Sequence, residues 1–408
     1  MSTGLLAVNE LPEAVVKRKL IAVPSLTGVR GLTTVWVALH HIYGTAATLL
    51  LLPWLADSSL LANGYRGVDL FFVLSGFILM RAHGTDFRTL RGPALYRFGL
   101  ARFFRIYPLN TIVLLAMVPL VLLEPGFVTW ARAFTDPHFS YKIHNLSAAG
   151  FVQSFLLVQT FTVAKLGEWN LAAWSLSAEL LGYILFPFLA FVLMRQRSAL
   201  LCNAGAVLCL TVLLVVLVVA GHGYNNPTGL FGSVRMLGCF TAGMFAHRAI
   251  EVGRRSLGPH AGSFLTICAV LLIALTMIHP RLVLLDNFGF LMLIVGLAYQ
   301  AGPVDWLLRT RPFLWMGKIS FSFYMIQEAT FRVFVWAFEK RLQGVPMLFR
   351  ALALIAVVAA CVMCAWALFN LVEKPSHRLG RRLAQPLQDR WERRSRRASS
   401  LPAGTSPT

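Results

Sequence analysis

The stretch Ser25–Pro53, SLTGVRGLTTVWVALHHIYGTAATLLLLP, predicts the first membrane helix and places polar groups inside it. Arg30 stands near its start, and the adjacent His40 and His41 stand near its middle. At about 100° per residue, His41 returns to within about 20° of the direction of Arg30, whereas His40 points about 80° away. At about 1.5 Å per residue, His41 lies about 16 Å along the helix from Arg30, near the middle of a hydrocarbon layer of about 30 Å. An ionisable side chain at that depth indicates a functional site, although a packing histidine in a large helix bundle fits the spacing equally well.

The whole chain has the composition of an integral membrane protein. Its 408 residues are 57% hydrophobic and 13% charged, and the mean hydropathy is +0.67, which excludes a large water-soluble domain. Because the first 25 residues lack an apolar core, a cleaved signal peptide is not expected. The six cysteines all fall in apolar segments, so they are expected to be buried hydrophobes and not disulfides. No metal is expected to take part in function.

Ten apolar segments of spanning length predict an all-α, polytopic membrane fold. They are residues 32–54, 66–81, 104–123, 172–194, 200–220, 230–248, 262–279, 282–300, 315–338 and 348–372. A shorter apolar piece, 151–163, is expected to lie at the membrane surface or to be re-entrant. The chain therefore divides into a cytoplasmic N-terminal segment (1–25), a ten-helix membrane domain (26–375) and a basic cytoplasmic tail expected to be disordered (376–408).

Basic residues predict how these segments are oriented. They gather before the first segment, between the second and third, and after the fourth, sixth, eighth and tenth. The intervening loops, such as 57–63 and 221–229, contain no lysine or arginine. Because basic residues accumulate on the cytoplasmic side, both termini are predicted to be cytoplasmic. This topology, with contacts to anionic membrane lipids, accounts for the net charge of +20, so nucleic-acid binding is not needed to explain it.

A buried carboxylate can be placed near the midplane. Glu179 lies about 10 Å from the outer end of its segment and could meet His41. There it would hold the tautomer of the imidazole and stabilise the imidazolium form of a general base. Alternatively, Glu179 pairs with Arg235, the isolated basic residue of the sixth segment, or all three form one network.

Other charged residues within the predicted membrane segments can be explained by structural roles. Asp69 lies near the outer end of the second segment, where a structural role is as well supported as a functional one. Glu328 and Arg332 are one helical turn apart, so they are expected to neutralise each other.

A cluster of arginines is predicted at the cytoplasmic rim. Arg102 and Arg105 share a helix face at the start of the third segment, and Arg30 occupies the same rim. Guanidinium groups bind phosphates through paired hydrogen bonds, so these residues could hold a phosphorylated cytosolic donor. The cytoplasmic preference for basic residues alone would also place arginines here.

Short motifs recur in order along nearly the whole membrane portion. They are Leu26-Thr-Gly-Val-Arg30-Gly-Leu with His41, Gly67-Val-Asp-Leu-Phe-Phe-Val-Leu-Ser-Gly-Phe77, Arg102-Phe-Phe-Arg105-Ile-Tyr-Pro108, Trp174-Ser-Leu-Ser-Ala-Glu179, Gly317-Lys-Ile-Ser-Phe-Ser-Phe-Tyr324 and Glu373-Lys-Pro375. Together they resemble the motifs of the acyltransferase-3 family of integral-membrane O-acyltransferases.

The resemblance implies an enzyme of the bacterial cytoplasmic membrane with ten helices. Its donor co-substrate would be cytosolic acyl-CoA, acetyl-CoA in particular, and its acceptor a hydroxyl of an extracytoplasmic or lipid-linked glycan. It implies catalytic roles for His41, Glu179 and Arg30, and coenzyme contacts from Arg102 and Arg105 together with Arg30. Further substrate contacts are expected from Asp69, Ser75, Trp174, Tyr183, Arg235 and Tyr324. Only about 35 residues follow the last segment, so no fused hydrolase-like domain is expected and exopolysaccharide is the expected acceptor. The oligomeric state is not predicted.

The sequence departs from the family pattern at three places. Thr27 stands where the first helix usually has an aspartate, and Leu180 stands where a second acidic residue usually follows Glu179. Ile326 and Gln327 occupy positions where many members have Trp-His, so a substrate role given to that histidine does not transfer directly to this chain.

The alternative to an enzyme is a proton-coupled transporter of a small solute or glycan precursor, because buried His, Glu and Arg also form proton relays. A transporter is expected to contain an internal repeat, and the hydropathy of the two five-helix halves shows none. The enzyme is therefore favoured. In it, His41 either takes the proton from the attacking hydroxyl or forms an acyl-histidine intermediate.

Overall fold

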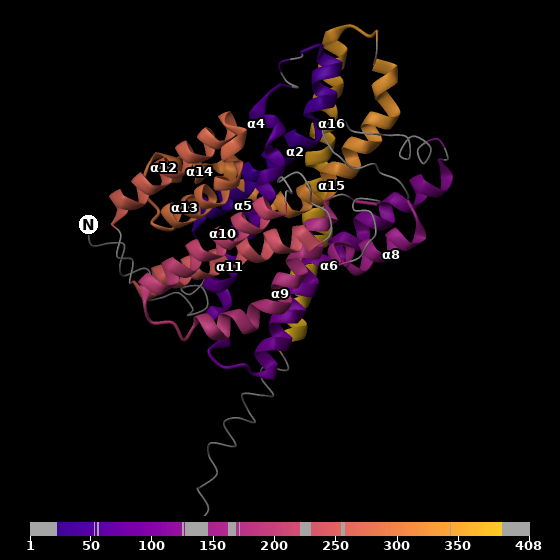
Figure 1. The fold of residues 1–408 in the computed structure, drawn as a ribbon. Coiled ribbons are helices and arrows are strands. Elements are labelled where there is room, and N and C mark those ends of the chain that lie inside the picture. The colour runs from indigo at the N-terminus through magenta and orange to yellow at the C-terminus, as the bar shows by residue number, and fades with distance from the viewer. Residues whose placement is uncertain are drawn as a thin grey trace, which may run out of the picture.

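The computed structural model describes residues 23–52, 54, 57–124, 126, 146–161, 169, 170, 172–220, 230–253, 258–342 and 344–385. These residues form helices and no strands, which confirms the all-α prediction (Figure 1). The α-helices are α2 (Pro24–Leu50), α4 (Ser59–Ala62), α5 (Gly67–His83), α6 (Gly92–Leu123), α8 (Ala148–Leu156), α9 (Ala173–Leu193), α10 (Ala199–Val219), α11 (Leu230–Val252), α12 (Pro259–Ile278), α13 (Asp286–Ala298), α14 (Pro303–Leu308), α15 (Arg311–Leu342) and α16 (Met347–Leu368). Short 3₁₀ turns are η1 (Gly64–Arg66), η2 (Gly84–Phe87), η3 (Gln159–Phe161) and η4 (Pro280–Leu285), and η5 (Phe369–Glu373) is a π-helical turn.

Within the described residues, six helical stretches are long and apolar enough to cross a membrane. They are Ser59–Phe87, Gly92–Leu123, Ala173–Leu193, Ala199–Val219, Pro259–Ile278 and Met347–Gln385. The other predicted spans are also helical and correspond to α2, α11, α13 and α15. Three of these carry ionisable residues that lower their hydropathy, and α13 has 13 residues. A multi-pass membrane protein is therefore supported, while the count of ten crossings and the orientation remain predictions.

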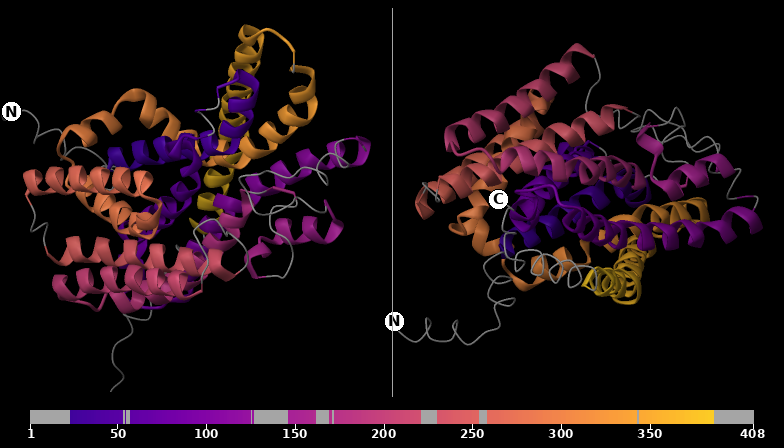
Figure 2. Two further views of the ribbon diagram at one scale, coloured as in Figure 1. Left: turned by 45° about the horizontal axis from the view of Figure 1, so that its top comes forward. Right: turned by 90° about the horizontal axis from the view of Figure 1, so that it is seen from below.

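The packing of α2 on α15 forms the centre of the fold. The two helices lie side by side along much of their length. A Cβ atom added at Gly317 would lie 2.0 Å from the carbonyl oxygen of Thr27, so only glycine allows this approach. Farther along, Arg30 contacts Ser320 and His41 contacts Gln327, which makes the two helices parallel. Together with α16 they project beyond the remaining helices (Figure 2).

Two buried ion pairs connect α5 to its neighbours. Arg235 on α11 donates to Asp69 on α5, with Nη2 2.9 Å from Oδ2. Arg66, at the entrance to α5, pairs with Asp286 at the start of α13. All four side chains are buried. Asp69, and not Glu179, is therefore the carboxylate partner of Arg235, because the rotation of α11 turns Arg235 toward α5.

Several smaller expectations can be compared with the structure. Glu328 and Arg332 form a buried ion pair, which confirms the prediction from their spacing. Of the six free cysteines, Cys202, Cys239 and Cys361 are buried as predicted, whereas Cys209 and Cys268 are partly buried and Cys364 is exposed. Residues 376–385, expected to belong to a disordered tail, are instead helical and continue α16 through η5 to Gln385.

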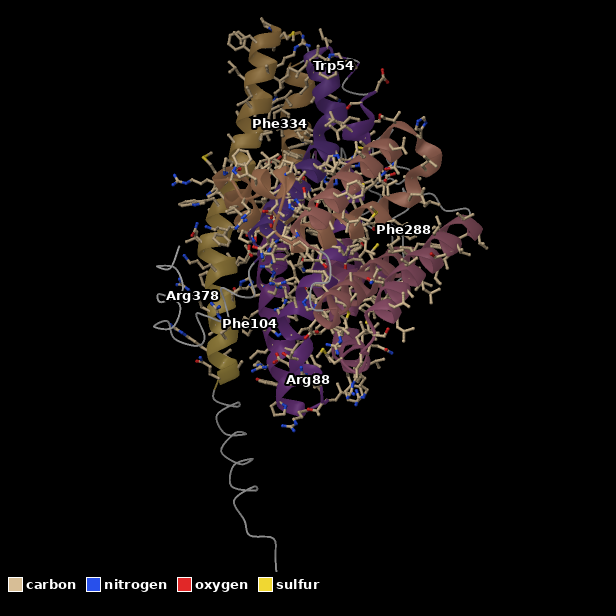
Figure 3. The ribbon with its side chains drawn as sticks, turned by 90° about the vertical axis from the view of Figure 1, so that its left-hand side faces the viewer. Trp54, Arg88, Phe104, Phe288, Phe334 and Arg378 are labelled. Atoms are coloured by element: carbon tan, nitrogen blue, oxygen red, sulfur yellow. The ribbon has the colours of Figure 1, made fainter. Side chains whose placement is uncertain are left out.

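The membrane orientation can be tested with two exposed residues at opposite ends of the molecule, Trp54 and Arg88 (Figure 3). In a background without native cysteines, we expect Trp54→Cys to react with a membrane-impermeant thiol reagent applied outside intact cells. Arg88→Cys should react only after the cells are opened, because the loop that contains it is rich in arginine. Labelling of both positions from the same side would contradict the predicted topology.

Candidate active site

A cavity of about 520 Å³ lies among α2, α5, α6, α9, α15 and the helical residues that follow η5. It brings together seven of the residues singled out in the sequence: Arg30, Ser75, Arg102, Arg105, Glu179, Tyr183 and Tyr324. Four others, His41, Asp69, Trp174 and Arg235, are not among its lining residues. Among the described residues, no group of three or more His, Cys, Asp or Glu could hold a metal ion.

The carboxylate of Glu179 is held at the cavity wall by two hydroxyl groups. Ser75 Oγ on α5 and Tyr183 OH on α9 each donate to Glu179 Oε1 at 2.8 Å. Arg30 lies within electrostatic range of the same carboxylate and donates to Ser320 Oγ at 2.9 Å. The anionic group and the cationic group therefore face one cavity from different helices, and Glu179 is fixed in orientation.

Arg102 and Arg105, which the sequence predicts to act as a pair, have different environments. The Arg102 guanidinium lies 5.5 Å from the ring centroids of both Phe98 and Tyr183. Its Nε is buried and has no hydrogen-bond partner among the described residues. Arg105 instead donates from Nη1 to Glu373 Oε1 at 2.7 Å. Arg102 is thus the guanidinium available to an anionic ligand, whereas Arg105 is already neutralised.

Glu373 is a site residue that the sequence reading did not assign. Its side chain is buried, and its second oxygen accepts a hydrogen bond from Ser322 Oγ at 2.6 Å. The Arg105 guanidinium also lies 4.7 Å from the Phe321 ring centroid. The hydrogen bonds of Glu373 with Arg105 and Ser322 connect α6, α15 and η5. Glu373 belongs to the Glu373-Lys-Pro375 motif, but the motif does not predict its partner, because Arg105 and Glu373 are 268 positions apart.

His41 lies beyond the inner end of the cavity. Its Nδ1 is 2.8 Å from Nε2 of Gln327 on α15. At the inner end, Ser175 Oγ and Tyr324 OH are 2.9 Å apart. Gln327 lies about one turn from Tyr324 on the side away from the rim.

The structure does not join Glu179 to His41. Glu179 lies about one turn from Ser175 on the rim side, near Arg30. Because Ser175 meets Tyr324, roughly two helical turns, or about 10 Å, separate Glu179 from the level of Gln327. The expected contact fails because residue spacing gives depth within one helix, whereas the relative height of two helices depends on how they pack.

The neighbouring His40 has a different environment from His41. Its Nδ1 lies 3.0 Å from the carbonyl oxygen of Leu61, and its ring stacks on Tyr43 with centroids 5.7 Å apart. The side chain is buried. The two histidines therefore face different neighbours, as the helix geometry predicts.

Three expected substrate residues form a separate buried cluster. The Arg235 guanidinium, paired with Asp69, lies 5.7 Å from the ring centroid of Trp174. All three side chains are buried, and none lines the cavity. Their contacts support a structural role in joining α5, α9 and α11.

Comparison with known proteins adds to this geometry. A family model described as an acyltransferase domain matches residues 23–366. The chain belongs to this acyltransferase family. The match includes every helix that contributes to the cavity except the residues after η5.

Two relatives of this acyltransferase-family chain are peptidoglycan O-acetyltransferases by name. OatA of Listeria monocytogenes is 23% identical over an alignment of 384 positions that covers 88% of this chain and 56% of the relative. YrhL of Bacillus subtilis, which bears that name provisionally, is 24% identical over an alignment of 383 positions that covers 86% of this chain and 54% of the relative. The chain thus spans about half the length of the curated relatives it matches. No solved structure matches it significantly.

In this member of the acyltransferase family, a departure from the family pattern lies beside the candidate catalytic histidine. Gln327 occupies the position where the family resemblance leads us to expect a histidine, and its amide contacts His41. Its Oε1 is buried without a partner among the described residues. In this orientation the amide N–H donates to Nδ1 of His41, so the neutral ring carries its proton on Nε2. Because amide oxygen and nitrogen are assigned from hydrogen bonding, the amide can also be turned, so that Oε1 accepts from Nδ1–H and the amide NH₂ takes the buried place of Oε1.

Proposed function

We propose that this protein is a membrane O-acyltransferase of the bacterial cytoplasmic membrane. It moves a short acyl group, acetyl in particular, from cytosolic acyl-CoA to a hydroxyl of an extracytoplasmic or lipid-linked glycan. The observation that carries the proposal is a cavity, in a chain of the acyltransferase family, whose arginines are not all neutralised.

The charge balance of the cavity supports an anionic donor. Two lining arginines have carboxylate partners, since Arg97 pairs with Asp86 and Arg105 pairs with Glu373. Three others line the cavity and form no ion pair among the described residues: Arg30, Arg102 and Arg381. Glu179 is the carboxylate that lines the same space. The surplus of positive charge suits the phosphate groups of coenzyme A, which guanidinium groups bind well.

The proposed chemistry uses His41 as the general base. In the proposed state the Gln327 amide is turned so that its Oε1 accepts from Nδ1–H, and Nε2 then keeps the lone pair that accepts the proton of the acceptor hydroxyl. The hydroxyl oxygen forms a bond to the thioester carbonyl carbon, the carbon–sulfur bond breaks, and the proton passes from His41 to the leaving thiolate. The acyl end of the donor must cross the contact between Ser175 and Tyr324 to reach this level.

In this proposal Glu179 acts on the donor side and not as the partner of His41. Its contacts with Ser75 and Tyr183 and its proximity to Arg30 support a role in orienting the inner part of the donor. A fixed carboxylate beside Arg30 also keeps that guanidinium in place between donor molecules.

The proposed acceptor is a glycan of the cell envelope. The names of OatA and YrhL refer to peptidoglycan, whereas the sequence alone favours exopolysaccharide. Measuring O-acetyl groups in the peptidoglycan and exopolysaccharide fractions, with and without the gene, identifies the acceptor. If both fractions keep their acetyl groups when the gene is absent, a glycan acceptor is contradicted.

Transfer of label from acetyl-CoA tests the reaction class. Membranes containing the protein should release free coenzyme A and place labelled acetyl groups in alkali-labile esters of a saccharide fraction. Membranes containing His41→Ala at equal abundance should do neither. If the protein moves a solute while acetyl-CoA stays intact, it is a transporter and not an acyltransferase.

The difference between the rim arginines leads to a prediction. Arg102→Ala should raise the apparent KM for acetyl-CoA about ten- to a hundred-fold, the scale of a lost charge-assisted contact. The amount of folded protein should not change, because Arg102 has no carboxylate partner in the described residues. Arg105→Ala, in contrast, should lower the amount of folded protein, because it leaves Glu373 buried without its cation, at a cost of about 3–5 kcal/mol.

Two control variants separate these effects. Arg88→Ala removes an exposed arginine that does not line the cavity, so KM should stay normal. Arg105→Ala combined with Glu373→Gln should recover much of the folded protein. Normal KM values in both rim variants would mean that these arginines serve membrane topology only.

A further inference from the structure

The helical residues beyond η5, outside the matched family region, contribute to the cavity. His377 and Arg381 are four residues apart, which places them on one helix face, and both line the cavity. Arg378 and Arg382 on the same helix do not line it, and Arg378 lies on its outer side (Figure 3). We propose that His377 and Arg381 form a subsite for the 3′-phosphate of the coenzyme A donor. This inference rests on the proposed function.

The segment that carries the subsite is docked and is not a free tail. A Cβ atom added at Gly380 would lie 2.9 Å from Cβ of Phe104, so this turn packs directly on α6. Figure 3 shows Phe104 beside this C-terminal helix. Ala384 is buried one turn later, and the ion pair of Arg105 with Glu373 fixes the turn before. The position of His377 and Arg381 at the cavity is therefore set by packing on both sides.

The hydrogen bonding of His377 leaves a donor for an anion. Arg105 Nη1 lies 3.5 Å from His377 Nε2, and a guanidinium can only donate. Nε2 is then the acceptor, so the neutral ring carries its proton on Nδ1, where it can donate to a ligand. Arg381, Arg102 and Arg30 all act electrostatically on this imidazole. Such a concentration of cations, with no ion pair to Arg381 in the described residues, favours a phosphate.

The order of groups along the cavity identifies which phosphate. Arg381 is exposed at the mouth, about two turns beyond Glu373, whereas Ser175 and Tyr324 lie at the inner end. The thioester of acyl-CoA is at the far end of the pantetheine arm from the nucleotide. With the acyl group directed inward, the nucleotide and its 3′-phosphate lie at the mouth, next to Arg381, and the pyrophosphate lies deeper, nearer Arg102.

Dephospho-coenzyme A, which lacks only the 3′-phosphate, is the probe. Binding of coenzyme A and of dephospho-coenzyme A to the purified, full-length protein in detergent would be measured by calorimetry. We expect the unmodified protein to bind coenzyme A about tenfold more tightly, the scale of one charge-assisted contact at a partly exposed site. Arg381→Ala should bind both ligands equally, with the affinity of the unmodified protein for dephospho-coenzyme A.

The matched control is Arg382→Ala, which removes the same charge from the adjacent position and should keep the tenfold preference. Gly380→Leu, which pushes the helix away from Phe104, should lose the preference even if Arg381→Ala folds poorly. The inference is overturned if Arg381→Ala keeps the preference or if the unmodified protein has none. If the unmodified protein binds neither ligand, the proposed donor itself is wrong, which is a distinguishable result.

Discussion

His41→Ala should lower the rate of acyl transfer by about 10²- to 10⁴-fold, the range for loss of a general base. The abundance of the protein and its affinity for coenzyme A should stay near normal, because His41 does not line the donor cavity. The rate is measured as acetyl transfer per quantity of inserted protein, and the affinity by calorimetry on the same preparation.

The adjacent histidine provides the control. His40 is buried, contacts the carbonyl oxygen of Leu61 and stacks on Tyr43. His40→Ala should therefore reduce the amount of folded protein and change activity per folded molecule little. Gln327→Leu should slow transfer without weakening coenzyme A binding, because the His41 ring loses the amide that orients it. Transfer retained in His41→Ala, or lost equally in both histidine variants, would show that the pair is structural.

Asp69→Asn should destabilise the protein by about 3–5 kcal/mol, because it leaves the buried Arg235 without its carboxylate partner. Arg235→Gln should destabilise the protein by a similar amount, because it leaves the buried carboxylate of Asp69 without its cation. The double variant should recover a large part of the loss, since no buried charge then lacks a partner. The free energy of unfolding in detergent, measured for all four proteins, gives the coupling between the two side chains.

An ion pair near the surface serves as the reference for this cycle. Glu251→Gln removes the partner of Arg248, and Glu251 is about one-third exposed, so its loss should cost less than about 1 kcal/mol. Coenzyme A binding per folded molecule should be normal in every variant of the cycle. A stable Asp69→Asn protein that no longer transfers acyl groups would instead support the substrate role that the family resemblance implies.

Helix type and helix face could be read from the sequence because both depend on neighbouring residues. The separation of His40 from His41 and the pairing of Glu328 with Arg332 follow from helical periodicity alone. The partner of Arg235 could not be read in this way. Asp69 is 166 positions away, and only the relative rotation of α5 and α11 selects it over Glu179.

In the candidate site, too, local features could be predicted from the sequence, whereas contacts between distant residues could not. Arg30, Arg102 and Arg105 line one cavity, which agrees with their predicted position near the starts of two segments, and their place at the cytoplasmic rim stays a prediction. Which of them has a carboxylate partner was not predictable, since Glu373 reaches Arg105 from the other end of the chain. His377 and Arg381 lie in a basic stretch whose composition is typical of a disordered tail. This stretch becomes part of the cavity wall only because it packs against Phe104.

The sidedness of the reaction tests the central claim most directly, namely that a donor cavity on the basic side feeds acyl transfer to a glycan on the other side. Labelled acetyl-CoA would be added to inside-out and to right-side-out membrane vesicles that contain the protein and its acceptor. Inside-out vesicles should consume acetyl-CoA and accumulate saccharide esters in their lumen, protected from an esterase added outside. Right-side-out vesicles should react only after the membrane is opened. Equal reaction of both intact vesicle types, or no consumption of acetyl-CoA by either, would contradict the account.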